Sequence, residues 1–272
     1  MYPVLFQIGH VTLHTYGLLV ATGVLLGLWR ARRQAERAGL DPDRVWNLGI
    51  YMVLAALVGS KLWLLLADWS YYVAHPREVF SFSTLLSGGV YYGGFLAALA
   101  VALLYARHFR MRFLTLADVY AAPLALGHAI GRLGCFAAGC CYGKPTSLAW
   151  GVTFTNLYAR EVVGTPLGTP LHPTQLYESA AEFLIFAFLV FLGRRQRFAG
   201  ELFASYAVLY GLARGTIEFF RGDPDRTLLA GGAFSLMQVV SVALIVMGVT
   251  LLLRRVPARL PAGVTTNHRA SR

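Results

Sequence analysis

Apolar residues occur along the chain in long runs that are separated by short polar segments. These runs fall in seven windows, near residues 11–30, 46–67, 88–107, 114–136, 174–193, 200–220 and 234–253. A helix that crosses a bilayer needs roughly 20 mostly apolar residues, because its backbone polar groups must be satisfied within the segment. The pattern therefore predicts an all-α integral membrane protein with about seven transmembrane helices. The fourth window is the weakest, because His128 and Arg132 fall inside it.

The basic residues between the windows predict an orientation. The segments after the first, third, fifth and seventh windows carry 16 Arg and Lys residues, whereas the alternate connections carry 5. Because Arg and Lys concentrate in cytoplasmic segments, we expect the N-terminus outside and the C-terminus in the cytoplasm. No positively charged segment precedes the first window, so we expect that span to be retained rather than cleaved as a signal peptide.

The longest connection, about 137–173, falls on the predicted outer side. It contains several Gly and Pro residues and the strand-like stretch AWGVTF, and we expect a small ordered outer cap there. Residues 1–256 are then one seven-span membrane domain, and residues 257–272 a polar, disordered cytoplasmic tail. The sequence shows no internal repeat, which argues against transporter folds built from duplicated halves.

Composition agrees with a membrane protein and narrows the possible partners. Only 14% of residues are charged and the mean hydropathy is +0.56, whereas soluble domains are about 25% charged. The net charge of +11 would suggest nucleic acid as a partner of a soluble protein, but here the basic residues lie between apolar runs. We therefore predict no nucleic-acid partner. The seven histidines show no HExxH or paired spacing, so we predict no metal, and no motif indicates a cofactor.

Three charged residues inside the windows need an explanation, because ionisable groups at bilayer depth are costly and usually functional. They are Arg132, Arg214 and Glu218, with Lys61 a weaker fourth. Arg214 and Glu218 are four residues apart on one predicted helix and can pair with each other. Arg132 has no acidic residue at helical spacing in its own window. Its anion must therefore come from another helix or from a ligand.

Arginine is well suited to phosphate, because its guanidinium stays charged and offers a planar fork of donors. Two such side chains near a membrane-exposed cavity suit a phospholipid headgroup, although the same pair could hold a structural carboxylate. Small residues surround Arg132, and Gly127 with Gly131 has the GxxxG spacing of close helix packing. Close packing and close approach to a ligand are both compatible with this composition.

Five motifs, spread in order over most of the chain, resemble the prolipoprotein diacylglyceryl transferase family. They are HTYG at 14–17, GGVYYGG at 88–94, GRLGCFAAGCCYG at 131–143, HPTQLYE at 172–178 and YGLARGTIEFFR at 210–221. The resemblance implies transfer of the diacylglyceryl group of phosphatidylglycerol to the lipobox cysteine thiol of an exported prolipoprotein. It also implies that Arg132 and Arg214 hold the phosphate and stabilise the leaving group. Tyr16, Tyr210, Glu218, Gly143 and His14 match other important positions of the family.

Two departures from the family pattern leave parts of the chemistry open. Tyr92 stands where many members have a histidine that is a candidate base, and a phenol is a poor base at neutral pH unless a cationic neighbour lowers its pKa. The cationic field, His14 or His172 could activate the thiol instead. Cys135 replaces a common asparagine, and Cys140 and Cys141 replace polar residues. These thiols are either reactive groups near the headgroup site or small apolar filler in a packed helix end.

Two other functions remain compatible with the sequence. One is a diverged paralogue that uses the same phospholipid with another acceptor, which the changes at Tyr92 and Cys135 favour. The other is a non-catalytic membrane protein, such as a transporter or a lipid-binding scaffold, in which the buried arginines form structural pairs. His172 is either a ligand-binding residue or, as is commoner for such a histidine, a cap at the helix entrance before Pro173.

Overall fold

The computed structural model describes residues 2–9, 11–81, 89–224 and 226–254, so the predicted tail at 257–272 lies outside the described residues. The described chain is mostly helical, as predicted. Long helices occur at all seven apolar windows: α1 (Thr15–Arg37), α2 (Pro42–Ala67), α5 (Tyr91–His108), α6 (Phe113–Ala138), α8 (Thr174–Leu192), α9 (Glu201–Glu218) and α10 (Leu236–Arg254). Shorter helices are α3 (Trp69–Ala74), η1 (Pro76–Phe80), α7 (Leu157–Val163) and η2 (Ala230–Gly232).

Six short strands form two-stranded antiparallel pairs within the described part of the chain. They are β1 (Val4–Ile8) with β2 (Val11–His14), β3 (Val152–Thr153) with β4 (Pro170–Leu171), and β5 (Leu228–Leu229) with β6 (Phe234–Ser235). The second strand of the first pair occupies residues 11–14, where the sequence predicted the start of the first membrane span. The segment VTLH has the alternating pattern of a strand and pairs with VLFQI, so α1 begins only at Thr15.

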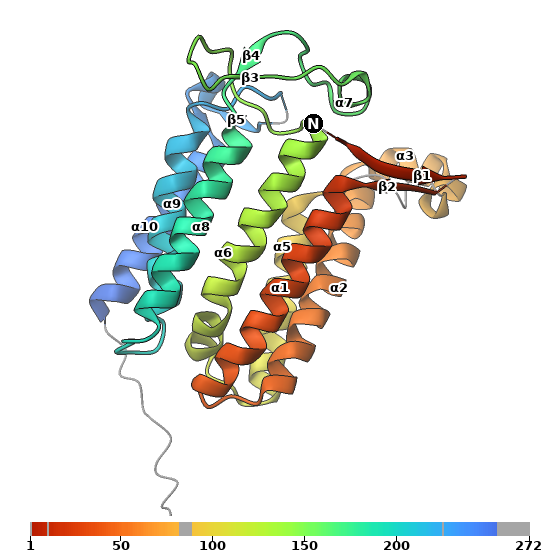
Figure 1. Ribbon diagram of the computed structural model, residues 1–272. Helices are drawn as coiled ribbons and strands as arrows, with labels where there is room; N and C mark the ends of the chain where they lie inside the picture. Colours follow the sequence, from red (N-terminus) through yellow and green to blue (C-terminus); the bar gives the residue numbers. More distant parts are fainter. Residues whose placement is uncertain (1, 10, 82–88, 225, 255–272) are drawn as a thin grey trace, which may run out of the picture. The chain divides into compact units, whose positions relative to one another are not determined.

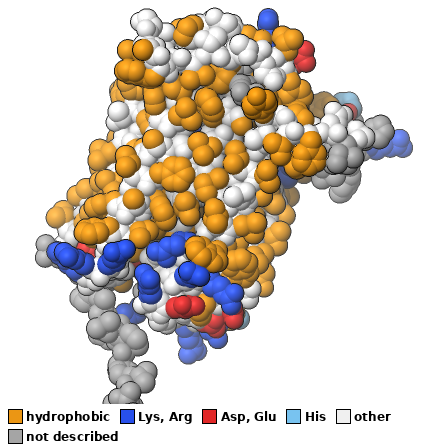
Figure 2. Space-filling view, in the orientation of Figure 1, with side chains coloured by type: hydrophobic (Ala, Val, Ile, Leu, Met, Phe, Trp, Pro, Cys, Tyr) orange, Lys and Arg blue, Asp and Glu red, His pale blue; other side chains and the backbone are white. Residues whose placement is uncertain are grey.

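Four of the helices in the described ranges are long and apolar enough to cross a membrane: Pro42–Ala67, Phe113–Ala138, Thr174–Leu192 and Leu236–Arg254. Their lengths match the hydrocarbon core of a bilayer at 1.5 Å per residue. Many large hydrophobic side chains on them are exposed, such as Leu57, Leu66, Leu184 and Leu253. Figure 2 shows hydrophobic side chains over much of the face in view, with Lys and Arg gathered near helix ends. An apolar exterior of this kind is expected of a protein whose solvent is lipid.

The chain divides into two compact units, one of Met1–Gly27 with Ala117–Arg272 and the other of Leu28–Leu116. In the second unit, α2 packs on α5 through glycines. A Cβ on Gly59 would lie 2.6 Å from the Gly93 carbonyl oxygen, and one on Gly94 would lie 2.9 Å from the Ala56 carbonyl oxygen. The backbones of α2 and α5 are therefore in contact at these glycines, where a larger residue has no room. Helix α2 begins after Asp41, whose carboxylate accepts hydrogen bonds from two backbone amides of the first turn.

The first unit holds α6, α8, α9 and α10, and Figure 1 shows the last three side by side. Its apolar core joins small residues of α6 to larger ones of α8 and α9; it consists of Ala121, Ala122, Ala125, Ile185, Leu189 and Leu202. The carboxylate of Asp118 on α6 accepts hydrogen bonds from the amides of Gly200 (2.5 Å) and Phe203 (2.9 Å) at the start of α9. This carboxylate satisfies amides that the first turn of α9 cannot satisfy itself.

Close backbone contacts also join α1 to α6 and α9 to α10. A Cβ on Gly23 would lie 2.9 Å from the Gly127 carbonyl oxygen, and one on Gly211 would lie 2.7 Å from the Ser241 carbonyl oxygen. The predicted packing role of Gly127 is thus seen, against α1. Gly131 has nothing within 4 Å of an added Cβ, so the GxxxG interpretation is wrong for that residue.

The stretch expected to form a cap contains β3, α7 and β4. Tyr142, Phe154 and Leu171 form its small buried core. Helix α7 ends at Gly164, whose φ of 69° is in the left-handed region that glycine favours. The buried hydroxyl of Thr165 donates to the Gly139 carbonyl 3.1 Å away. These contacts attach the cap directly to the segment that leaves α6.

Candidate functional site

Arg132 lies on α6 and finds its anion on another helix, as the sequence predicted. Its Nε atom forms an ion pair with the carboxylate of Glu178 on α8 and donates to His128 Nε2 at 3.2 Å. The side chains of Arg132 and Glu178 are 15% and 5% exposed. Two charges at this depth are tolerated because each offsets the other. The pairing fixes α6 against α8 in the middle of the unit.

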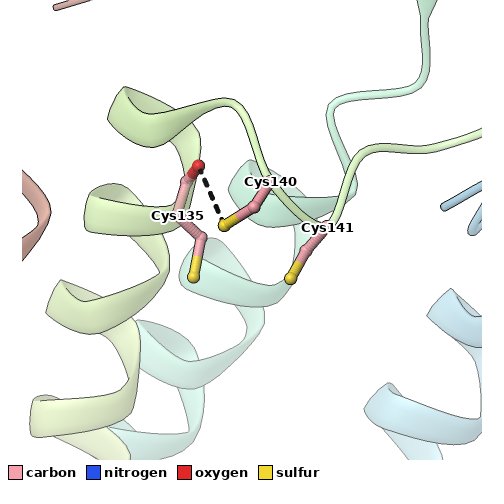
Figure 3. Close-up of side chains that lie close together, drawn as sticks. All are labelled: Cys135, Cys140 and Cys141. Atoms are coloured by element: carbon pink, nitrogen blue, oxygen red, sulfur yellow. Dashed lines mark hydrogen bonds between the residues drawn. The ribbon is translucent and has the colours of Figure 1, made fainter. Parts of the chain in front are cut away.

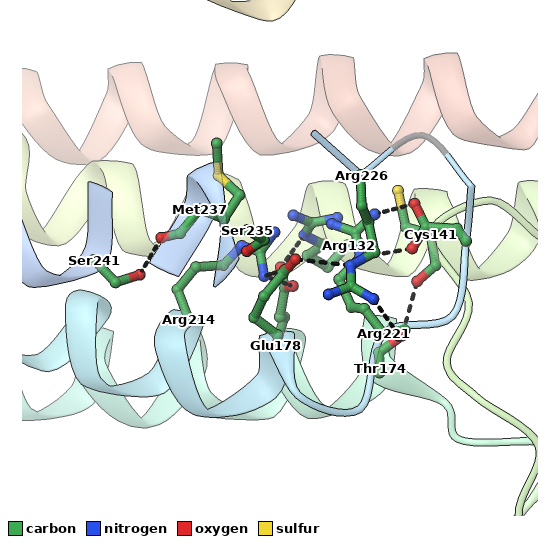
Figure 4. Close-up of polar contacts among 12 residues, drawn as sticks. Arg132, Cys141, Thr174, Glu178, Arg214, Arg221, Arg226, Ser235, Met237 and Ser241 are labelled. Atoms are coloured by element: carbon green, nitrogen blue, oxygen red, sulfur yellow. Dashed lines mark hydrogen bonds and ion pairs between the residues drawn. The ribbon is translucent and has the colours of Figure 1, made fainter. Parts of the chain in front are cut away.

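Arg214 and Glu218 form the pair predicted from their spacing on α9. The distance from Arg214 Nη1 to Glu218 Oε2 is 2.6 Å, and both side chains are almost fully buried. Arg214 Nη1 also lies 3.6 Å from Glu178 Oε1. Glu178 therefore lies between the two arginines that sequence analysis singled out, and the three side chains are seen together in Figure 4. The two guanidinium groups converge on one carboxylate.

The network continues toward the segment after α9. Glu218 Oε1 accepts from Arg226 Nε at 2.9 Å, and Arg221 forms a bidentate ion pair with Asp223. Burial alone lowers the pKa of the Arg221 guanidinium, but hydrogen bonds to the Asp223 carboxylate raise it above its usual value. The ion pair with Asp223 therefore favours the charged form of Arg221.

His128 and Glu182 form a second polar pair beside this network. His128 Nδ1 lies 2.8 Å from Glu182 Oε1, and His128 Nε2 lies 3.2 Å from Arg132 Nε, which donates toward it. Glu182 is almost fully buried, and neither of its carboxylate oxygens has a hydrogen-bond partner in the described part of the chain. The His128 ring therefore lies between the Glu182 carboxylate and the Arg132 guanidinium.

A small hollow lies beside these residues, with an empty space of about 170 Å³ that includes open solvent. Polar atoms come to it from both α8 and α9, and its lining is Glu178, Ala181, Glu182, Tyr210, Ala213, Arg214 and Ile217. The ring of Tyr210 lies 5.5 Å from the His128 ring and stacks on Tyr206. This volume is below the roughly 300–1,000 Å³ of a typical ligand pocket, so the convergence of charged side chains, and not the size of the hollow, marks the candidate site.

Gly143 lies where three backbone segments meet near the end of α9. Its amide donates to the His172 carbonyl at 3.0 Å, and the next amide, of Lys144, donates to the Phe220 carbonyl at 2.8 Å. A Cβ on Gly143 would lie 2.5 Å from the His172 carbonyl oxygen and 2.8 Å from that of Phe220. Only glycine fits there. The structure therefore gives Gly143 a packing role, and its proposed contact with substrate stays a prediction.

The remaining predicted residues lie on different elements. Tyr16, in the first turn of α1, is 45% exposed and packs on Gly134, two residues from Arg132. His14, on β2, forms a hydrogen bond of 2.9 Å with the Tyr158 hydroxyl of the cap. His172 does not cap a helix; its Nδ1 lies 3.2 Å from the Tyr177 hydroxyl. Tyr92 is on α5 in the second unit, and its catalytic role stays a prediction.

Sequence reasoning missed three residues of the network, namely Glu178, Glu182 and His128. A signal was available for the two glutamates, because both fall inside the apolar window 174–193 at a spacing of one helical turn. Glu178 ends the HPTQLYE motif, which was quoted for its resemblance and not for its charge. Their partners could not be assigned, because no sequence pattern tells which helices adjoin.

Comparison with known proteins gives a consistent result. The family model described as "Prolipoprotein diacylglyceryl transferase" matches residues 3–254. A phosphatidylglycerol–prolipoprotein diacylglyceryl transferase of Clostridium tetani is 32% identical over 249 residues, which are 92% of this chain and 96% of the relative. The enzymes of the same name from Geobacter sulfurreducens and Geobacillus kaustophilus are 34% and 35% identical, over 92% and 91% of this chain and 93% and 90% of the relatives. The resemblance noted in five sequence motifs is thus confirmed, and this chain belongs to the prolipoprotein diacylglyceryl transferase family.

Proposed function

We propose that this protein transfers the diacylglyceryl group of phosphatidylglycerol to the lipobox cysteine thiol of exported prolipoproteins, the first step of lipoprotein maturation. Its family and the names of its relatives support this activity. The observation that carries the proposal is the convergence of Arg132 and Arg214 on Glu178 beside a pocket. Two guanidinium groups held this close can together bind the two sides of one phosphate.

The reaction forms a carbon–sulfur bond and breaks a carbon–oxygen bond, and it moves one proton. The acceptor thiol gives its proton to a base, its sulfur attacks the terminal glycerol carbon of the diacylglyceryl group, and the carbon–oxygen bond to phosphate breaks. Glycerol phosphate leaves with the electron pair of that bond. Negative charge grows on the departing phosphate, and fixed positive groups in a site with little water stabilise it strongly. Arg132 and Arg214 supply that charge in this proposal, and no cofactor is needed.

Other residues have supporting roles in the proposal. Glu218 pairs with Arg214, and Tyr210 lines the same hollow as Arg214; both contribute to phosphatidylglycerol binding, together with Gly143 and His14. Tyr16 packs two residues from Arg132 and is assigned to catalysis with Tyr92. A base is still required, because a thiol with a reference pKa near 8.5 attacks only as thiolate.

The proposed setting is a bacterial plasma (inner) membrane. The seven long helices cross it as seven spans, with the N-terminus outside, the segment 137–173 as an outer cap and the C-terminus in the cytoplasm. The uneven distribution of basic residues supports this orientation. It also puts the acceptor thiol and the cap on the same side of the membrane, which suits an acceptor that is exported.

The test is transfer by the purified protein from phosphatidylglycerol to a lipobox peptide. The expected products are a thioether-linked diacylglyceryl peptide and glycerol phosphate in equal amounts. Arg132→Lys and Arg214→Lys should each lower the rate on the order of 10²-fold, because lysine keeps the charge and loses the fork. Arg160→Lys, at an exposed position of α7, is the matched control and should leave the rate unchanged.

Three results would count against the proposal or a part of it. No product with a competent peptide would refute the transfer to this acceptor. Release of glycerol phosphate or of another diacylglyceryl product without peptide modification would instead support a paralogue with a different acceptor. Equal rates in the two arginine variants and the control would remove the phosphate role while leaving the activity in place.

A further inference from the structure

The three cysteines of the chain gather at the C-terminal end of α6. Cys135 lies in its last turns, while Cys140 and Cys141 lie on the segment that follows. Their sulfur atoms all lie within 4.8 Å of one another, and none forms a disulfide. Figure 3 shows the three side chains together, with the Cys140 thiol directed toward the Cys135 carbonyl at 3.7 Å. All three are partly buried.

The first turn of α8 holds the backbone of Cys140 and Cys141 in place. Gln175 Nε2 donates to the Cys140 carbonyl at 2.7 Å, and Thr174 Oγ1 donates to the Cys141 carbonyl at 2.8 Å. Both donor residues are about 1% exposed. Cys141 has a φ of 58°, a left-handed conformation that costs energy for a residue with a Cβ. The contacts from α8 maintain this conformation, and it brings the third sulfur to the other two.

Three sulfurs at this separation match the geometry of a metal ion with thiolate ligands. With metal–sulfur bonds of about 2.3 Å, tetrahedral or trigonal coordination puts neighbouring sulfurs roughly 3.8–4.0 Å apart. The sulfurs here need to move together by about 1 Å or less. Thiolates select soft or borderline ions and disfavour Mg²⁺ and Ca²⁺.

We propose that Cys135, Cys140 and Cys141 form a binding site for one thiophilic metal ion of the Zn²⁺ class. The three thiols release three protons when the ion binds, so a Zn²⁺ complex carries one net negative charge. Arg132 Nη1 lies 4.0 Å from the Cys135 sulfur and donates toward it, which offsets that charge. The fourth coordination position is left to water or another small ligand.

The number of sulfurs favours a metal over the two simpler explanations. A disulfide would use two of the thiols and leave the third beside it without a function. Apolar filler requires neither the strained backbone of Cys141 nor the two hydrogen bonds from buried side chains of α8. The histidine spacing predicted no metal, and no histidine takes part in this site.

The experiment is a metal titration of the purified full chain in detergent, kept reduced with a phosphine and freed of metal. Cd²⁺ serves as the probe, because its thiolate complexes absorb in the ultraviolet, and Zn²⁺ competes for the site. We expect one equivalent of Cd²⁺, loss of all three titratable thiols on binding, and displacement by Zn²⁺. The readout is binding, so it does not depend on the transferase activity proposed above.

Variants test the geometry. Cys135→Ser, Cys140→Ser and Cys141→Ser should each weaken binding at least 100-fold. Thr174→Val keeps all three thiol ligands and removes only the hydrogen bond to the Cys141 carbonyl, so it should weaken binding on the order of 10-fold. This variant also tests the site if a cysteine variant fails to fold. The proposal is wrong if fewer than three thiols titrate in the reduced metal-free protein, if no equivalent of Cd²⁺ binds, or if the cysteine variants bind as well as the parent.

Discussion

Glu178 offers a direct test of the charge network, because it is the carboxylate between two buried guanidinium groups. Glu178→Gln keeps the size of the side chain and removes its charge. At 3.6 Å, the distance from Arg214 Nη1 to Glu178 Oε1, the attraction is about 5 kcal/mol at an effective dielectric constant of 20. Removing one partner of a buried ion pair costs about 3–5 kcal/mol, because the other partner remains charged.

The loss should lie at the lower end of that range. Arg214 keeps its shorter contact with Glu218 in the variant, and Arg132 keeps its hydrogen bond to His128. We therefore expect the free energy of unfolding to fall by about 3 kcal/mol. The measurement is reversible unfolding by SDS in mixed micelles, followed by tryptophan fluorescence. The matched control is Glu161→Gln on α7, which removes the same charge from an exposed position and should change stability by less than about 0.5 kcal/mol.

A double variant tells whether the stability loss in Glu178→Gln comes from the unpaired guanidinium or from a general packing defect. If the cost of Glu178→Gln arises from an unpaired cation, then Arg132→Met in the same chain removes that cation and restores part of the stability. The coupling energy of the two sites should be about 1–3 kcal/mol. Strictly additive losses, or a Glu178→Gln protein as stable as the Glu161→Gln control, would refute the reasoning.

Three further substitutions test the contacts that position the site, each by thermal unfolding in detergent. Gly143→Ala should lower the free energy of unfolding by about 1–3 kcal/mol, because the added methyl group overlaps two carbonyl oxygens. The control Gly131→Ala, whose methyl group meets open space, should leave stability unchanged or raise it. Equal melting temperatures of the two variants would contradict this prediction. Gly211→Ala should destabilise similarly by separating α9 from α10. Asp118→Asn should cost about 1–2 kcal/mol, because one acceptor of the α9 amides is lost; Asp68→Asn serves as the control, and equal losses in both would contradict a capping role.

Hydrophobic length alone located the long helices to within a few residues over most of the chain. The fifth and sixth windows, 174–193 and 200–220, correspond to Thr174–Leu192 and Glu201–Glu218. The largest difference is at the first window, where a hairpin occupies residues 11–14 and the helix continues to Arg37. Hydropathy cannot detect that continuation, because the last turns of α1 are helical and polar.

The sequence predicted Arg132, Arg214 and Glu218 as buried charged residues of the site, but it predicted only some of their partners. The spacing of Arg214 and Glu218 is a local property of one helix, so the pair followed from sequence. The partner of Arg132 depends on which helix lies beside α6 and at what depth, and this information is not local. Gly143 shows the same limit. Its motif position suggested substrate binding, whereas the contacts of its backbone show that a side chain has no room there.

The pairing of every arginine in the network with a carboxylate has a consequence for how an anion binds. The network as a whole is close to neutral. If Arg132 and Arg214 bind phosphate as proposed, the phosphate competes with Glu178 and Glu218 for the same donors. Phosphate binding would then be an exchange, with an affinity set by the difference between two anions. The same carboxylates would compete with the anionic product for the guanidinium groups after the reaction and so favour its release.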